Sequence, residues 1–235
     1  MKLSIIIPIF NEEKTIKEVL KRVASVRLPF IEKEVVIVDD ASTDGSKLII
    51  QKSGIKGLKI IFHQKNMGKG RAIRTGIKQA TGEVIIIQDA DLEYNPDDYS
   101  KLLRPIIENK AKVVFGSRLM DYPLRFWGKD KTILPYHLIA NKFLTFLTNL
   151  LYGSHLTDME TGYKLFKSDL LKKISITSNR FEFEPEITVK ILKLKIPITE
   201  IPIKVKPRTY QEGKKISWRD GILAVWELVK YKFVD

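Results

Sequence analysis

Short runs of hydrophobic residues alternate with amphipathic segments along the first half of the chain. The hydrophobic runs occupy residues 3–10, 34–38, 58–62, 83–88 and 112–115. Their apolar residues are consecutive rather than alternating, as in a parallel strand whose two faces are both covered. Four of the runs precede segments with helical periodicity, at residues 12–26, 43–52, 68–80 and 96–109. This alternation predicts an α/β fold with a Rossmann-like, mostly parallel central sheet flanked by helices.

The pattern changes after about residue 117. Residues 120–133 mix basic and aromatic residues with Pro and Gly, which is typical of a loop. The periodicity then predicts one strand and three helices, at residues 198–205 and at residues 134–152, 185–194 and 217–233. No stretch has the composition of a linker between domains. We therefore expect one domain over residues 1–235, with a C-terminal helical elaboration.

The predicted helix at residues 134–152 is the most apolar of these segments. Its hydrophobic side, which we expect to pack on the core, consists of Leu138, Ile139, Phe143, Phe146, Leu147, Leu150 and Leu151. The opposite side carries Asn141, Thr145, Thr148 and Asn149. Because His137, Asn141, Lys142 and Asn149 interrupt the roughly 20 apolar residues that a membrane span needs, we expect no transmembrane helix.

The N-terminus has one lysine and a short apolar run. Pro8 and the acidic residues Glu12 and Glu13 stand where a secretory signal peptide has a small-residue cleavage site, so we expect no signal peptide. The chain also has no cysteine, which excludes disulfides, thiolate metal sites and cysteine nucleophiles. These features predict a cytoplasmic protein.

The composition is strongly basic. Lys and Arg number 41 against 28 Asp and Glu, which gives a formal net charge of +13. This excess favours an anionic partner, which could be a nucleic acid, a phosphorylated small molecule or an acidic membrane surface. A nucleic-acid-binding protein would interleave basic and aromatic residues on a sheet or a recognition helix. The strand ends carry carboxylates instead, so we expect no nucleic-acid partner and keep that class as a weaker alternative.

Three acidic residues follow the hydrophobic run at residues 83–88. Asp89, Asp91 and Glu93 are spaced two apart, so in an extended chain their side chains point the same way. Carboxylates this close repel one another unless a cation neutralises them. A few carboxylates combined with substrate phosphates are typical of Mg²⁺ and Mn²⁺ sites, and open α/β sheets bind ligands at this end of a central strand. The alternative is a solvated acidic turn before a helix that starts at Pro96.

A second acidic pair, Asp39 and Asp40, follows the run at residues 34–38. A carboxylate at a strand end can accept hydrogen bonds from a ribose or a base. A dinucleotide-binding fold would also need G-x-G-x-x-G after the first strand, and residues 8–13 read Pro-Ile-Phe-Asn-Glu-Glu instead. We therefore exclude NAD as the cofactor.

Residues 64–71 form a basic, glycine-containing turn before the helix predicted at residues 68–80. A helix N-terminus and a lysine side chain both attract phosphate, which makes Lys69 a candidate ligand. The turn lacks the full Walker A register, so by itself it indicates no particular nucleotide.

Several motifs occur together in a fixed order along the chain. They are Pro8-Ile-Phe-Asn-Glu12, Val38-Asp39-Asp40-x-Ser42-x-Asp44-Gly45, Asn66-x-Gly68-Lys69-Gly70, Asp89-Ala90-Asp91, Gly116-Ser117-Arg118, Asp158-Met-Glu160-Thr161-Gly162-Tyr163-Lys164 and Arg208-Thr-Tyr-Gln-Glu-Gly-Lys214-Lys215. In this combination the chain resembles a family 2 glycosyltransferase with the GT-A fold, in the branch of dolichol-phosphate mannose synthase and related polyprenyl-phosphate glycosyltransferases. The resemblance covers essentially the whole chain.

The resemblance implies a nucleotide-sugar-binding half at residues 1–116 and an acceptor-side half, with amphipathic helices, at residues 117–235. The nucleotide sugar would be bound by Pro8, Phe10, Glu12, Val38, Asp39, Asp40, Lys69, Asp89, Ala90, Arg208 and Lys214, with Lys215 as the alternative to Lys214. A divalent metal, Mg²⁺ or Mn²⁺, would be held by Asp91 and Glu93. Because the mannose synthases carry Gln at position 93, the preferred metal and the donor are open.

The resemblance also implies the catalytic residues, which are Asp89, Asp91, Arg118, Asp158 and Glu160. Arg118 would contact phosphate together with Arg208 and Lys214. An arginine in a loop of the mannose synthases has three candidate counterparts here: Arg125, Lys129 and Lys131.

The expected activity is metal-dependent, inverting transfer of a mannose- or glucose-type hexose from a GDP- or UDP-sugar to a polyprenyl (dolichyl) phosphate. A phosphate acceptor is already anionic and needs no general base. The first alternative is a saccharide hydroxyl acceptor, whose proton Asp158 or Glu160 would accept. A further alternative is a catalytically inactive regulator that binds nucleotide sugars.

The C-terminal part of the chain is basic and aromatic. Residues 187–235 carry eleven Lys and Arg against five Asp and Glu, with Trp218, Trp226, Tyr231 and Phe233 among them. Such a segment could dock on anionic lipid. We therefore expect at most a peripheral association with the cytoplasmic face of a membrane; the alternative is a solvated basic surface.

Overall fold

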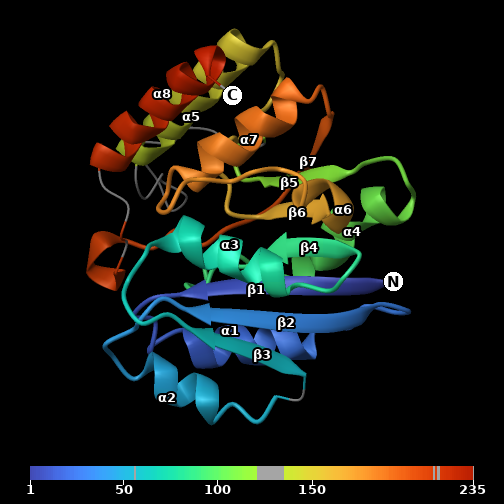
Figure 1. Ribbon diagram of the computed structural model, residues 1–235, viewed down its shortest axis with the longest axis vertical. Coiled ribbons are helices and arrows are strands. Elements are labelled where there is room, and N and C mark those ends of the chain that lie inside the picture. Colours follow the sequence, from blue (N-terminus) through green and yellow to red (C-terminus); the bar gives the residue numbers. More distant parts are fainter. Residues whose placement is uncertain (56, 121–134, 214, 216–217, 235) are drawn as a thin grey trace, which may run out of the picture.

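A seven-stranded sheet forms the centre of the molecule (Figure 1). The computed structural model describes residues 1–55, 57–120, 135–213, 215 and 218–234. In their order across the sheet, the strands are β3 (Leu58–Phe62), β2 (Glu32–Asp39), β1 (Lys2–Ile9), β4 (Val84–Ile87), β6 (Lys164–Lys167), β5 (Val113–Ser117) and β7 (Ile198–Pro202). β6 is antiparallel to both of its neighbours, and the other pairs are parallel. The predicted mostly parallel sheet is confirmed.

Helices cover both faces of this sheet. They are α1 (Ile16–Ser25), α2 (Ser46–Gln51), α3 (Lys69–Gln79), α4 (Tyr99–Ile107), α5 (Pro135–Tyr152), α6 (Ser168–Leu171), α7 (Phe183–Lys193) and α8 (Trp218–Phe233), with the 3₁₀ helices η1 (Pro96–Asp98) and η2 (Tyr210–Glu212). α1 and α4 contribute to the core on one face, and α3 and α7 contribute to the core on the other. Each predicted helix is present, with ends that differ by a few residues from the sequence pattern.

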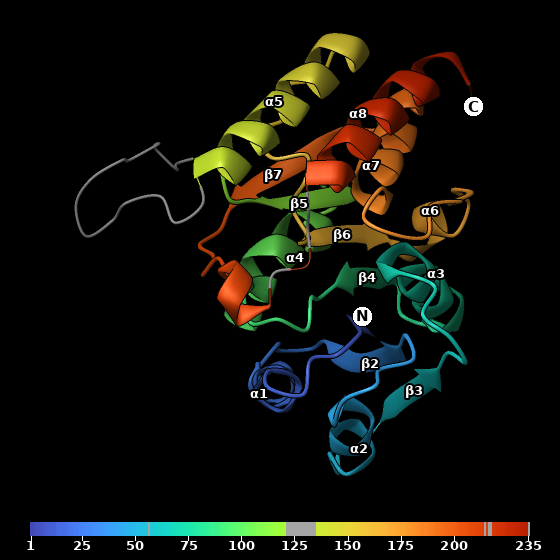
Figure 2. The ribbon, with the colours of Figure 1, turned by 90° about the vertical axis from the view of Figure 1, so that its left-hand side faces the viewer.

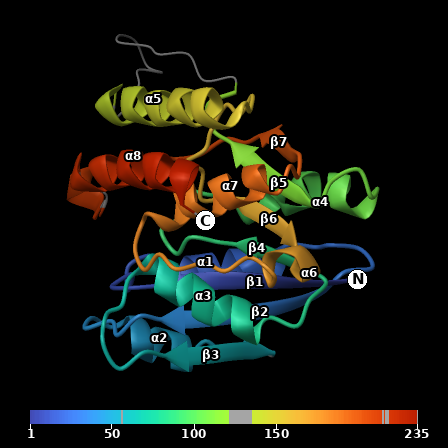
Figure 3. The same ribbon diagram turned by 45° about the horizontal axis from the view of Figure 1, so that its top comes forward.

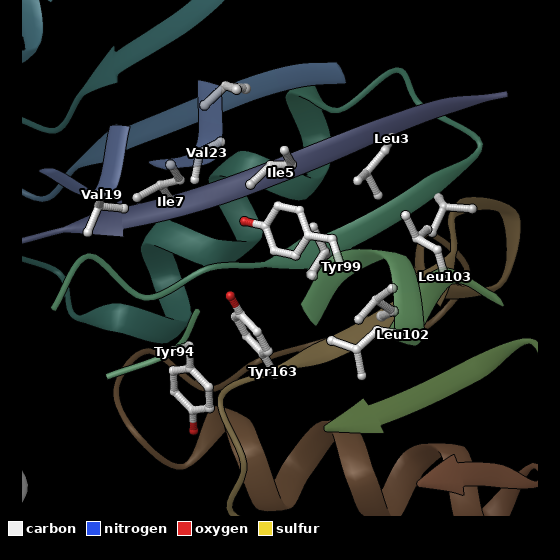
Figure 4. Close-up of a cluster of buried hydrophobic side chains, with 14 of the residues drawn as sticks. Leu3, Ile5, Ile7, Val19, Val23, Tyr94, Tyr99, Leu102, Leu103 and Tyr163 are labelled. Atoms are coloured by element: carbon white, nitrogen blue, oxygen red, sulfur yellow. The ribbon is translucent and has the colours of Figure 1, made fainter. Parts of the chain in front are cut away.

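The central strand β1 shows why its apolar residues are consecutive. Leu3, Ile5 and Ile7 lie in the cluster that includes Tyr99 of α4 (Figure 4), whereas Ile6 lies in the cluster on the opposite face. Successive side chains of a strand point to opposite faces, so a strand covered on both sides needs apolar residues at every position. The carboxyl end of β1 is thereby held in the middle of the sheet.

The second half of the chain completes the sheet that the first half begins. β6 lies between β4 and β5, and β7 pairs with β5 at the edge. The sequence pattern missed β6, because the strand is short and has a lysine at each end. Lys164, its first residue, is nevertheless fully buried.

Our expectation for the packing of α5 is wrong for four of its seven apolar side chains, which are exposed: Ile139, Phe143, Phe146 and Leu150. Leu138 is buried, and Leu147 and Leu151 pack against the core as expected. Two residues of the polar side, Thr145 and Thr148, are buried as well. The Oγ1 of Thr148 donates to the carbonyl oxygen of Leu144 (2.8 Å), and the Oγ1 of Thr145 accepts from the backbone N–H of Met159 (3.1 Å). Because both hydroxyls have partners, burying this side costs little.

The three helices α5, α7 and α8 lie together at one end of the molecule (Figures 1 and 2). Leu144 of α5, Val189 of α7 and Leu228 of α8 share a third hydrophobic cluster. Within the residues that the structure describes, no helix is both long enough and apolar enough to cross a membrane.

A buried carboxylate, Glu186 of α7, joins this helical layer. It accepts hydrogen bonds from the backbone N–H groups of Thr177 (2.8 Å) and Ser178 (2.8 Å), from the ammonium of Lys190 (2.6 Å) and from the hydroxyl of Tyr231 in α8 (2.8 Å). Burial opposes ionisation, but these donors outweigh it and lower the pKa of Glu186 to about 2. Its charged form therefore stabilises the contact between α7 and α8.

Glu186→Gln is expected to lower the free energy of unfolding by about 2 kcal/mol at neutral pH, because buried donors lose a charged acceptor. The pKa of Glu186 is lower in the folded chain than the value of about 4.3 in an unfolded one. Its stabilisation is therefore complete above that value and is lost as the pH falls toward about 2. Urea unfolding at several pH values measures both effects.

The matched control is Glu32→Gln, which removes an exposed carboxylate that pairs with Lys2 at 3.4 Å. An exposed pair contributes little, so this variant should unfold like the unmodified protein. Equal stability of the two variants would contradict the role given to Glu186.

Candidate functional site

A cavity of about 790 Å³ lies at the carboxyl ends of the neighbouring parallel strands β1 and β4. Most residues that the sequence assigns to the donor, the metal or catalysis line it: Pro8, Phe10, Glu12, Asp40, Lys69, Asp89, Ala90, Asp91, Glu93, Arg118, Glu160 and Arg208. Another part of its wall is apolar and comes from α5 and α8, including Phe143, Leu144, Ile222 and Val225. The cavity therefore joins a charged region to an apolar one.

Asp89, two residues after the end of β4, belongs to a chain of alternating charges. Its carboxylate lies 2.8 Å from the ammonium of Lys69, which is 3.3 Å from the carboxylate of Glu184. Glu184 in turn pairs with the buried Lys164 at 2.6 Å. Although burial alone would lower it, Asp89 and Glu184 raise the pKa of Lys69. Lys69 therefore stays charged and is engaged with carboxylates within the cavity wall.

Three tyrosines, which Figure 4 labels, and Gln88 hold the segment that carries Asp89. The hydroxyls of Tyr99 and Tyr163 both donate to the side-chain oxygen of Gln88, at 2.7 and 2.6 Å. The amide of Gln88 donates to the carbonyl oxygen of Asp89 (2.9 Å). The ring of Tyr163 also stacks on that of Tyr94, with centroids 4.5 Å apart. This packing fixes the position of the backbone before the acidic residues.

The loop that contains Gly162 lies close to the Asp89 carboxylate and to Tyr94. A Cβ atom at position 162 would lie 2.4 Å from the Oδ2 of Asp89 and 3.0 Å from the ring of Tyr94. Only glycine fits there without moving the site. Gly162, part of the motif after Asp158, is thus placed against the acidic strand end.

Asp91 faces a guanidinium from the C-terminal part of the chain. The Nη2 of Arg208 lies 3.1 Å from the Oδ2 of Asp91, and the backbone N–H of Arg208 donates to Glu93 (2.9 Å). Burial, followed by repulsion from Asp89 and Glu93, raises the pKa of Asp91 to about 7, against the attraction of Arg208. The acidic segment after β4 therefore carries more negative charge than the neighbouring cationic side chains neutralise.

These carboxylates fit a divalent cation that shares its ligands with a substrate. Asp91 and Glu93 offer hard oxygen atoms, and a cation would relieve the repulsion that Asp89 and Glu93 exert on Asp91. Among residues 1–55, 57–120, 135–213, 215 and 218–234, no three ligating side chains form a complete metal cage. A small set of carboxylates completed by phosphate oxygens is the arrangement that suits Mg²⁺ or Mn²⁺.

Glu12, which follows β1, pairs with two cationic side chains. Arg208 donates to both of its carboxylate oxygens, at 3.0 and 3.2 Å, and the ammonium of Lys215 lies 2.7 Å away. Lys215, the alternative to Lys214, thus lines the charged part of the cavity. Lys214 lies outside the described residues.

The loop candidates Arg125, Lys129 and Lys131 also lie outside the described residues. Their expected contact with phosphate therefore remains a prediction from the resemblance.

The two aspartates at the end of β2, Asp39 and Asp40, have different surroundings. Asp40 accepts hydrogen bonds from the backbone N–H groups of Met67 (3.0 Å) and Gly68 (2.6 Å) and contacts the Nδ1 of His63 at 2.7 Å. Asp39 is also buried, and its Oδ1 has no hydrogen-bond partner among the described residues. It lines a second hollow, of about 520 Å³, beside the main cavity. Asp40 thus fixes the turn before α3, whereas the Oδ1 of Asp39 remains available as a hydrogen-bond acceptor.

The N-terminus of α3 is less open to phosphate than the sequence suggests. The N–H groups of Gly70 and Arg71 donate to the carbonyl oxygens of Arg180 (3.2 Å) and Asn179 (3.0 Å). A Cβ atom at position 70 would lie 2.8 Å from the carbonyl oxygen of Ser178. The glycine allows the helix to dock on the loop before α7, and this contact uses the amides that a phosphate would need.

Arg118, at the end of β5, is held by Asp158. Its Nε and Nη2 donate to the two carboxylate oxygens at 2.7 and 2.8 Å, and its backbone N–H donates at 2.9 Å. Asp158 is completely buried and does not line the cavity, and the same holds for Val38 of β2. Asp158 therefore orients Arg118 toward the cavity and is poorly placed to accept a proton from an acceptor.

Glu160 has the opposite character. It lines the cavity, and its Oε1 is buried without a hydrogen-bond partner among the described residues. Burial raises its pKa to about 7, with Glu184 adding to the shift and Lys164 opposing it. A carboxyl with a pKa near neutrality is suited to general base catalysis. Of the two proposed bases, the geometry favours Glu160.

Sequence reasoning missed three residues that support the site: Gln88, Lys164 and Glu184. Two of them had a signal in the sequence. Gln88 interrupts a hydrophobic run directly before Asp89, and Lys164 closes the motif that begins at Asp158. Glu184 had none, because a single glutamate near a helix start is usually solvated.

Known proteins resemble the chain in both sequence and structure. A model of the family described as Glycosyl transferase family 2 matches residues 4–175. The UDP-N-acetylglucosamine–dolichyl-phosphate N-acetylglucosaminyltransferase of Methanococcus voltae is 30% identical over 97% of this chain and 95% of its own. The low-salt glycan biosynthesis hexosyltransferase Agl6 of Haloferax volcanii is 27% identical over 99% of this chain and 53% of its own.

Glucosyl-3-phosphoglycerate synthase from Mycobacterium tuberculosis, crystallised with Mn²⁺, uridine diphosphate and phosphoglyceric acid, has a similar fold. It matches with a TM-score of 0.76 at 15% identity, covering 100% of this chain and 79% of its own. This likeness confirms the predicted GT-A fold. Because the family model covers most of the residues that build the sheet and the acidic strand end, the chain belongs to glycosyl transferase family 2 and is a glycosyltransferase.

Proposed function

We propose that the protein transfers a sugar from a nucleoside-diphosphate sugar, UDP-linked or GDP-linked, to a polyprenyl phosphate with inversion at the anomeric carbon. The observation that carries the proposal is the cavity itself, in which Asp89, Asp91 and Arg118 share one space with the apolar wall from α5 and α8. A lipid phosphate has the same combination of a charged group and an apolar chain. The activity named for the Methanococcus voltae relative supports this acceptor.

In the proposed reaction, an oxygen of the acceptor phosphate forms a bond to the anomeric carbon from the side opposite the diphosphate. The bond from that carbon to the diphosphate oxygen breaks, and its electron pair leaves with the nucleoside diphosphate. A divalent cation, held by Asp91 and Glu93, would supply positive charge to the leaving diphosphate. Arg118, held by Asp158, and Arg208 face the same space and stabilise phosphate charge.

No group needs to remove a proton from the lipid phosphate, because that nucleophile is already an anion.

The charged part of the cavity contains Arg208 and Lys215, both paired with Glu12. A diphosphate that enters it competes with Glu12 for these cations. We therefore propose that Arg208 and Lys215 exchange a carboxylate partner for phosphate oxygens when the donor binds.

Asp91→Asn is expected to reduce transfer by about a hundredfold or more, because the metal site loses a charge while the shape is kept. Transfer of labelled sugar from UDP-N-acetylglucosamine, UDP-glucose and GDP-mannose to polyprenyl phosphate, with Mg²⁺ or Mn²⁺, measures this effect. Asp97→Asn changes an exposed carboxylate of η1 and should leave the rate unchanged. An Asp91→Asn variant as active as the control would refute the metal role. No lipid-linked product from any donor would refute the acceptor.

A saccharide hydroxyl is the second candidate acceptor, and Glu160 is the observation that favours it. Glu160 would accept the hydroxyl proton. Its Oε1 in the cavity wall has no hydrogen-bond partner among the described residues, and its pKa is raised to about 7. A hydroxyl acceptor requires the ionised form of Glu160, so the rate should rise as the pH increases through about 7.

Glu160→Gln separates the two acceptors. With a polyprenyl phosphate acceptor, we expect the variant to keep its rate within about tenfold, because no general base is used. With a saccharide acceptor, the loss should be about a hundredfold or more, and the rise near pH 7 should disappear. Rates of the variant and of the unmodified protein over a pH series, with each acceptor, give the answer.

A further inference from the structure

His63 follows the edge strand β3, and its side chain is only 7% exposed. It lies where three elements meet, because α3 packs against β2 and β2 pairs with β3 (Figure 3). The backbone N–H of His63 donates to the carbonyl oxygen of Asp39 (2.9 Å) at the end of β2. A buried histidine needs partners for both ring nitrogens, and these partners indicate its role.

Both ring nitrogens of His63 have a partner. Nδ1 lies 2.7 Å from the Oδ1 of Asp40, and Nε2 lies 3.0 Å from the Oγ1 of Thr75 in α3. The Asp40 carboxylate also accepts hydrogen bonds from the backbone N–H groups of Met67 and Gly68. Since a carboxylate only accepts, Nδ1 carries the hydrogen, and Nε2 of the neutral ring accepts from the hydroxyl of Thr75. These contacts fix both the tautomer of His63 and the orientation of the Asp40 carboxylate.

The loop at residues 64–68 depends on this carboxylate. The side chains at residues 64–66 are exposed, and they form no hydrogen bonds within the part of the chain that the structure describes. The loop is therefore held at its ends. His63 holds one end at β2, and Asp40 holds the other end through the amides of Met67 and Gly68.

The turn that Asp40 holds has little freedom to move. Gly68 has a φ of +95°, which favours glycine. A Cβ atom at this position would lie 2.4 Å from the carbonyl oxygen of Asn179. The next residue is Lys69, whose ammonium lies 2.8 Å from the carboxylate of Asp89. A displaced turn would therefore move Lys69 relative to the acidic segment after β4.

The same loop forms a wall between the main cavity and the hollow of about 520 Å³. Gln64 and Lys65 line the smaller hollow, and Lys69 lines the main cavity. Asn66 and Phe10 line both. A ligand that extends from one space into the other passes beside this loop, so the shape of the loop determines whether the ligand fits.

We propose that His63 is a positioning residue for the nucleoside diphosphate part of the donor. It acts through Asp40, which keeps the loop at residues 64–68 in the shape that binds the nucleotide. The inference rests on the proposed function for the class of donor and is independent of the acceptor. It can therefore be tested by nucleotide binding, without sugar transfer.

The test is calorimetric titration of the full chain with UDP and with GDP, each with Mn²⁺. His63→Phe keeps a ring but loses the N–H that Asp40 accepts, so the dissociation constant should rise about tenfold or more. His63→Asn keeps a donor in the place of Nδ1, so its dissociation constant should stay within about threefold of the unmodified value. The control is His155→Phe, which changes an exposed histidine after α5 and should bind nucleotide like the unmodified protein.

Two further measurements separate positioning from a general loss of stability. In an Asp40→Asn background, His63→Phe should have little further effect on binding, because residues that act through one contact are not additive. In His63→Phe alone, hydrogen exchange should become faster at the amides of Met67 and Gly68 but not at Ile37 in the middle of β2. A general loss of stability would make exchange faster at all three amides.

Equal binding by His63→Phe and the unmodified protein would overturn the positioning role. So would a His63→Asn variant as weak as His63→Phe, or additive effects of His63→Phe and Asp40→Asn. Binding of neither nucleotide by the unmodified protein would refute the donor of the proposed function together with this inference. Failure of transfer to a lipid phosphate, with nucleotide binding intact, would refute the acceptor alone.

Discussion

The site depends on a row of charges that alternate in sign, from the buried Lys164 and Glu184 to the partly buried Lys69 and Asp89. It joins β6, α7, α3 and the end of β4. A buried charge is tolerated only when it is paired, and the removal of one partner leaves the next uncompensated. Each member therefore restricts the positions of its neighbours. The acidic strand end is fixed by residues far away in the chain, and the two halves of the molecule are joined at this point.

The fold and the charged part of the site follow largely from local sequence patterns. Consecutive apolar residues, such as those around Ile6, indicate a strand covered on both faces. A strand end followed by Asp89 and Asp91 predicts where the carboxylates meet, because parallel strands end at one edge of the sheet. These features need only a few neighbouring residues, so the sequence pattern is sufficient.

Features that depend on distant partners could not be predicted in this way. The short strand β6 is recognisable only once β4 and β5 lie on either side of it. Helical periodicity shows that α5 has an apolar and a polar side, but it does not say which side is covered. Thr145 and Thr148 could be buried because Met159 and the helix backbone provide hydrogen-bond partners. Likewise, the sequence does not reveal that both carboxylate oxygens of Asp158 accept hydrogen bonds from Arg118.

Arg208 and Lys215 lie between β7 and α8 in the sequence, and α8 lines the apolar part of the cavity. Arg208 and Lys215 reach Glu12 from this segment, and α8 begins a few residues after Lys215. A ligand that drew these cations away from Glu12 would change the contacts of residues close in sequence to α8. Any resulting change in the affinity of α8 for a partner would be reciprocal, because the partner would then change the affinity of the cavity for that ligand by the same factor.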